Sequence, residues 1–238
     1  MKKLFTIMMM AATITLTAQN KELPIIFPEE LEIELALSSL PAHLRADAAV
    51  YVFKRKLGYV KVKDGTNGFT ALVERPIGFP TSFAPVSFDE EGTKTHIPRI
   101  FDQGKWMEES KSVKEIQEMV REKFATNQYG IPKTTGISYM LSPLNILPSP
   151  TGKPAWYYPH YMIYASYVKK SDLGLGKFSW HTDAPMLLDQ GPHGLLVVRM
   201  GIEESNKIKE QEKDLIFKME KFLGKKLSSF EIAMNHDH

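Results

Sequence analysis

The chain has 238 residues, of which 43% are hydrophobic and 24% charged, a composition typical of a globular protein. Its 30 basic and 28 acidic side chains nearly balance, and a near-neutral surface exerts no long-range attraction on nucleic acid, so nucleic-acid binding is not expected. The chain has no cysteine, which excludes disulfides, thiolate nucleophiles and cysteine metal sites.

The first residues have the features of a secretory signal. Lys2 and Lys3 precede an apolar stretch, residues 4–16, after which the chain becomes polar. This order predicts export, with cleavage near Ala18 or Gln19. Because the stretch is shorter than the roughly 20 apolar residues that cross a bilayer, no transmembrane span is expected in the mature chain. A membrane anchor or a buried N-terminal helix is the alternative.

The mature chain, residues 20–238, is expected to form a single α+β domain, in which a mixed or mainly antiparallel sheet carries packed helices. Residues 29–40 alternate as a strand would, but their glutamate, leucine and alanine content favours a helix. Residues 48–75 predict a three-strand meander with turn dipeptides at 64–68. A phosphate-binding loop is disfavoured there because the Walker lysine is absent. Residues 76–95 predict an irregular loop.

The middle and the end of the chain predict alternating helices and strands. The middle elements are a helix at 97–108, a helix at 113–125 with a capping box of Ser112 and Glu115, a strand at 136–141, a proline-rich loop and an aromatic strand at 157–168. After a loop at 169–192, an apolar run at 195–200 predicts a central strand. A charged helix at about 203–223, with Gly224 as its C-cap, precedes a short tail.

Candidate catalytic residues lie between residues 156 and 193. His160 and His193 each follow a proline and open a predicted strand, where a histidine can serve as an acid or base near neutral pH. Asp189 could complete a hydrolytic site with them. The alternative is that both histidines are half-buried groups with satisfied hydrogen bonds.

A divalent metal is a second possibility. His181 and Asp183 have a spacing that could present two ligands from one loop, and imidazole with carboxylate suits zinc, iron or manganese. Because so short a pattern has little specificity, we favour histidines that cap or hydrogen-bond within loops.

Ligand binding without catalysis would draw on other residues. Trp156 and Tyr161 belong to a dense aromatic run that could stack on a sugar or peptide, and Asn67 could line a site. Tyrosines at these positions also fit an ordinary half-buried strand, which we favour.

Four segments, taken in order, resemble a family of exported bacterial proteins that have no assigned function. They are residues 65–70 (Gly-Thr-Asn-Gly-Phe-Thr), 136–141 (Gly-Ile-Ser-Tyr-Met-Leu), 159–162 (Pro-His-Tyr-Met) and 192–193 (Pro-His). The resemblance spans roughly residues 33–200 and implies an exported globular protein, without implying an activity. Some of those proteins carry cysteine where this chain has Ala71, which argues against a thiol role here.

Two functions follow from these observations. The first is a non-catalytic extracytoplasmic module that binds a small ligand, an envelope component or a partner protein; the near-neutral charge, the aromatic run and the lack of a catalytic motif favour it. The second is a hydrolase-type enzyme that uses His160 and His193, with Asp189 or a metal. Joint catalysis requires the two imidazoles to converge within roughly 5 Å on a shared cavity.

Overall fold

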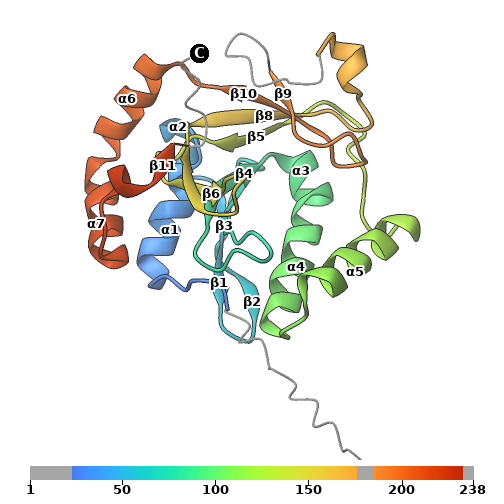
Figure 1. Cartoon of the computed structure of the whole chain (residues 1–238), viewed down its shortest axis with the longest axis horizontal. Coiled ribbons are helices and arrows are strands. Elements are labelled where there is room, and N and C mark those ends of the chain that lie inside the picture. The colour runs from blue at the N-terminus through green and yellow to red at the C-terminus, as the bar shows by residue number, and fades with distance from the viewer. Residues whose placement is uncertain (1–22, 176–184, 233–238) are drawn as a thin grey trace, which may run out of the picture.

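The structure is a computed structural model that describes residues 23–175 and 185–232, and these form one packed α+β domain (Figure 1). The predicted fold class is therefore confirmed. Within the described ranges, the helices are too short or too polar to cross a membrane.

The described residues form a large mixed sheet, a small sheet and helices on both sides. The helices are α1 (Glu29–Ser38), α2 (Ala42–Arg45), α3 (Glu90–Thr95), α4 (Ile97–Glu108), α5 (Val113–Ala125), α6 (Ile202–Gln211) and α7 (Lys213–Leu223), with 3-10 turns at Lys170–Leu173 and Leu227–Ser229. The large sheet has the order β2 (Gly58–Lys63), β1 (Ala49–Lys54), β3 (Thr70–Glu74), β4 (Ala84–Phe88), β5 (Ile137–Met140), β8 (His160–Tyr164), β10 (Leu195–Arg199) and β9 (Met186–Leu187). The small sheet has the order β11 (Glu231–Ile232), β7 (Pro154–Tyr157) and β6 (Asn145–Pro148).

The large sheet is a middle layer with α1 and α7 on one side and α3, α4 and α5 on the other (Figure 1). Because successive side chains of a strand face opposite sides, a central strand can contribute to two cores. Ala71 and Val73 of β3 belong to the core beneath α1 and α7, whereas Leu72 belongs to the core beneath α4. The core beneath α4 also takes Met162 and Tyr164 from β8.

The predicted meander of residues 48–75 is wrong in its last connection. β2 pairs with β1 as an antiparallel hairpin, but β3 runs parallel to β1 on its other side. The segment between β2 and β3 therefore crosses the end of β1, where Thr66 N and Asn67 N donate to Asp47 O. The turn dipeptides mark a change of direction correctly, but they cannot specify which strand the chain joins next.

Gly65 lies where this crossing touches β1, and we expect Gly65→Ala to destabilise the fold by about 1–3 kcal/mol. A Cβ there would collide with the main-chain nitrogen of Ala49 and lie 2.6 Å from the carbonyl carbon of Ala48, so the backbone would have to move. Urea denaturation followed by circular dichroism measures the loss. Gly201→Ala is the matched control, since its added Cβ meets no described atom within 4 Å; equal stability of the two variants would contradict the prediction.

Local predictions succeeded best where one segment carried its own signal. Helices α1, α4 and α5, the capping box at Ser112, and strands β5 and β10 all lie where predicted, and Gly224 is the left-handed C-cap of α7 with φ of 66°. The single C-terminal helix was wrong, because the chain breaks between α6 and α7 at Glu212.

Proline-containing segments were predicted incorrectly. The predicted loop at 76–95 contains the buried strand β4 and the whole of α3. Pro85 is tolerated in β4 because β5 pairs only with Ser87 and Phe88, so at Pro85 only β3 is paired. The proline-rich loop before residue 157 contains β6 and most of β7. The predicted aromatic strand at 157–168 is broken at Pro159 and ends at Tyr164; its first residue, Tyr157, closes β7, which belongs to a different sheet from β8.

Candidate functional site

His160 and His193 do not share a site. His160 pairs with Arg199 at one end of the β8–β10 ladder, whereas His193 lies in the turn just before Leu195, which pairs with Tyr164 at the other end, about 13 Å of strand away. His160 is buried, and its Nδ1 lies 2.8 Å from the carbonyl oxygen of Tyr158. The convergence that joint catalysis requires is therefore absent.

His193 is held as a neutral core histidine. Its Nε2 donates to Gly130 O at 2.8 Å, and its ring stacks on His96 with centroids 4.3 Å apart. Burial lowers the pKa of His193 to about 4, although the Asp189 carboxylate favours the charged form slightly. Asp189 itself is exposed, and its Oδ1 accepts from Gly191 N.

The buried partner of His193, His96, carried no sequence signal because it belongs to no motif. Its ring lies between those of His193 and Tyr164, and its Nδ1 donates to Thr95 Oγ1, which itself donates to Glu91 O. Burial lowers the pKa of His96 to about 2. His96 Nε2 and His193 Nδ1 have no hydrogen-bond partner among the described residues, so both rings are expected to be neutral over the physiological range.

The predicted ligand-binding residues make structural contacts. Asn67 Nδ2 donates to Leu44 O and its Oδ1 accepts from Phe69 N, which fixes the loop before β3. Trp156 is buried and donates to Pro143 O, while Tyr161 is half-buried on β8.

The predicted metal ligands, His181 and Asp183, lie outside the described residues. In the part of the chain that the structure describes, no group of three or more histidine or acidic side chains could hold a metal ion.

An apolar recess lies elsewhere, and we call it the α4–α5 groove. It has a volume of about 360 Å³, within the range of small-molecule sites of roughly 300–1,000 Å³. It is lined by Leu23 and Pro24, by residues 76–80, by Met107 of α4, by residues 110–113 and by Ile116 of α5.

The groove follows from two tight turns. Residues 76–80, Pro-Ile-Gly-Phe-Pro, leave β3 in a bend where Phe79 N donates to Pro76 O and Gly78 has φ of 80°. On the opposite wall α4 ends at Glu108, and α5 begins after its N-cap Ser112. An apolar loop bounded by prolines was visible in the sequence, and it is the signal that could have indicated this site.

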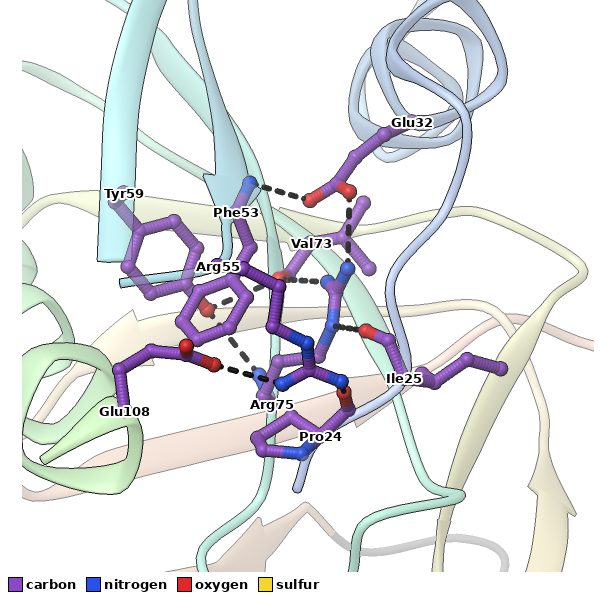
Figure 2. Close-up of polar contacts among 9 residues, drawn as sticks. All are labelled: Pro24, Ile25, Glu32, Phe53, Arg55, Tyr59, Val73, Arg75 and Glu108. Carbon is purple, nitrogen blue, oxygen red and sulfur yellow. Dashed lines mark hydrogen bonds and ion pairs between the residues drawn. The ribbon is translucent and has the colours of Figure 1, made fainter. Parts of the chain in front are cut away.

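A buried ion pair holds the segment that leads into the groove (Figure 2). Glu32 of α1 and Arg75 lie 3.0 Å apart with side chains about 1% exposed, and Glu32 Oε1 accepts from Phe53 N. Arg75 Nε donates to Ile25 O, and its Nη1 donates to Val73 O. The Arg75 guanidinium therefore fixes the chain next to Pro24.

A second pair holds Pro24 itself (Figure 2). Arg55 donates to Pro24 O and, at 2.8 Å, to Glu108 Oε1, while the other oxygen of Glu108 accepts from Lys56 N. From the other side, Ile25 N donates to Pro80 O at 2.9 Å. The segment at Pro24 and Ile25 is thus linked to α4 through the Arg55 and Glu108 side chains, and to the loop at 76–80 through a main-chain bond.

The charge among the groove's lining residues is of one sign, positive. Apart from Lys111, its lining consists of apolar and serine side chains, with no carboxylate. Lys111 is exposed, and no described residue forms an ion pair with it.

Compared with models of known families, with curated proteins and with solved structures, the chain matches none.

Proposed function

We propose that this protein is an exported, non-catalytic binding module, whose α4–α5 groove takes a small molecule with an apolar body and an acidic head. The observation that carries the proposal is the preformed apolar groove, in which the main chain at Pro24 and Ile25 is held by hydrogen bonds from Arg55 and Arg75. Preorganised walls lower the ordering cost of binding. Export is supported by the leader-like residues 1–19.

The acidic head follows from charge complementarity at the rim. Lys111 is the lone charged side chain among the groove's lining residues, and it adjoins Ser110 and Ser112. A carboxylate or phosphate at this rim would meet the ammonium group while its apolar part covers the prolines and Ile77. The hydrolase alternative loses its main support, because it depended on His160 acting together with His193.

Probes that share one alkyl chain and differ in their head group test the proposal on residues 20–238. We expect isothermal titration to detect decanoate binding, with decanol weaker and decylammonium weakest, because only the head group differs. Lys111→Gln is expected to weaken decanoate binding about two- to five-fold, which corresponds to the free energy of an exposed charge pair, and to leave decanol binding unchanged.

A blocking variant separates the groove from the rest of the surface. Val113 is 42% exposed at the first position of α5, so Val113→Asp places a carboxylate in the groove without opening the core. An acidic residue in a first helical turn is itself favourable. We expect Val113→Asp to abolish decanoate binding and Gln117→Asp, at an exposed position of α5 that does not line the groove, to preserve it. Equal binding by both variants, or no binding by the parent protein, would refute the proposal.

A further inference from the structure

A second recess lies at the other end of α5, and we call it the aromatic hollow. It has a volume of about 440 Å³ and lies between the first half of α4, strand β1 and the end of α5. Whereas the α4–α5 groove is apolar with a single charge, this hollow has an aromatic wall and a polar wall. It therefore calls for a different ligand.

The aromatic wall consists of Tyr51 of β1 and Phe101 of α4. Their ring centroids are 4.6 Å apart, and both residues are half-buried while lining the hollow. Behind them Tyr59 stacks on Phe101 at 5.4 Å, which fixes the orientation of the Phe101 ring. A fixed aromatic ring offers an apolar surface at little entropic cost, because its side chain is already ordered.

The polar wall is a charged pair that the fold holds in place. Asp102 Oδ2 accepts from Lys123 Nζ at 2.5 Å and from Tyr129 OH at 2.9 Å. The Lys123 ammonium lies over the rings of Trp106 and Tyr129, at 5.5 and 5.4 Å from their centroids. The Asp102 and Lys123 side chains remain 28% and 30% exposed, so a ligand can still reach them.

The hydrogen-bonding capacity of this wall exceeds what the protein uses. Both bonds to Asp102 are on Oδ2, so Oδ1 keeps its acceptor capacity. Gln128, which also lines the hollow, donates to Thr126 through Nε2 and keeps its amide oxygen as an acceptor. Two acceptors and an ammonium donor therefore line the same hollow as an aromatic surface.

These groups select against ions and against purely apolar molecules. The opposite charges of Asp102 and Lys123 cancel, so neither an anion nor a cation gains from the local field, and an apolar ligand would desolvate both charges without compensation. A polyhydroxylated ring satisfies both walls, since its C–H face covers the aromatic side chains and its hydroxyls bond to the carboxylate, amide and ammonium. We propose that the aromatic hollow binds a neutral saccharide unit.

Oligosaccharide titrations on residues 20–238 test this proposal. Isothermal titration with maltohexaose, cellohexaose and the N-acetylglucosamine hexamer is expected to show binding by at least one of them. Phe101→Leu keeps an apolar side chain against Tyr59 but removes the flat ring, and we expect at least a five-fold loss of affinity. Asp102→Asn, which breaks the charged bond to Lys123, is expected to cost about tenfold or more.

The controls separate this site from the α4–α5 groove and from general effects. Phe217→Leu removes an exposed aromatic ring on α7 and should leave saccharide affinity unchanged. Val113→Asp should also leave it unchanged, so failure of one proposal does not imply failure of the other. If none of the three hexamers binds, if Phe101→Leu binds as well as the parent protein, or if a uronic-acid oligomer binds more tightly than the neutral ones, the proposal is wrong.

Discussion

Arg75→Met is expected to lower the free energy of unfolding by about 3–5 kcal/mol, the cost of leaving one member of a buried ion pair without its partner. Glu32 would keep only the bond from Phe53 N, and Ile25 O would lose its donor. The guanidinium also lies over the rings of Phe27 and Phe53, so its removal takes packing as well as charge. Chemical denaturation measures the change.

The loss should depend on pH in a definite direction. Burial raises the pKa of the Glu32 carboxyl, and Arg75 offsets this only in part, so removing Arg75 raises that pKa further. A carboxyl whose pKa is raised in the folded state favours folding while it is protonated, and this contribution disappears as the pH rises through the folded-state pKa. The deficit of Arg75→Met should therefore be larger near about pH 8 than near about pH 5.

Two further variants identify the cause. In Arg75→Met, adding Glu32→Gln removes the unpaired charge yet keeps an oxygen for Phe53 N, so part of the stability should return. Lys94→Met is the matched control, because the Lys94–Glu90 pair is exposed and such pairs contribute about 1 kcal/mol or less. The explanation fails if Lys94→Met costs as much as Arg75→Met, or if the second substitution at Glu32 makes the protein less stable.

This ion pair also illustrates what a sequence pattern can and cannot predict. The capping box at Ser112 and Glu115 was predictable because both partners lie within one helical turn. Glu32 and Arg75 lie 43 positions apart, and each alone resembles an ordinary surface charge. Only the packing of α1 over β1 and β3 brings them together.

The candidate sites follow the same rule. His160 and His193 were chosen for similar local contexts, but antiparallel pairing of β8 with β10 places similar contexts at opposite ends of a ladder. The groove depends on a turn after β3, a turn before α5 and the first described residues, which no single window contains. The proline-bounded apolar loop at 76–80 was its one local sign, and its prolines favoured the interpretation as an irregular loop.

The stacked pair of His96 and His193 predicts the second large effect, a loss of stability in mild acid. Burial lowers the pKa of His193 to about 4 and that of His96 to about 2, from 6.5 in the unfolded chain. A histidine whose pKa is lowered in the folded state binds fewer protons there than in the unfolded chain. Its full contribution to the free energy of unfolding is therefore present above about pH 6.5 and falls as the pH decreases. Arg99 disfavours both charged forms, and Asp189 opposes it only at His193.

Between about pH 6.5 and pH 4, each of the two histidines should contribute a slope of about 1.4 kcal/mol per pH unit. His96→Phe is expected to halve this contribution, because an aromatic ring still stacks on Tyr164 and His193 while one titrating group is lost. Urea denaturation at several pH values measures the slopes, and His43→Phe, at an exposed position on α2, provides the matched background. A slope as steep in His96→Phe as in His43→Phe would show that protonation of the stacked pair does not drive the acid response.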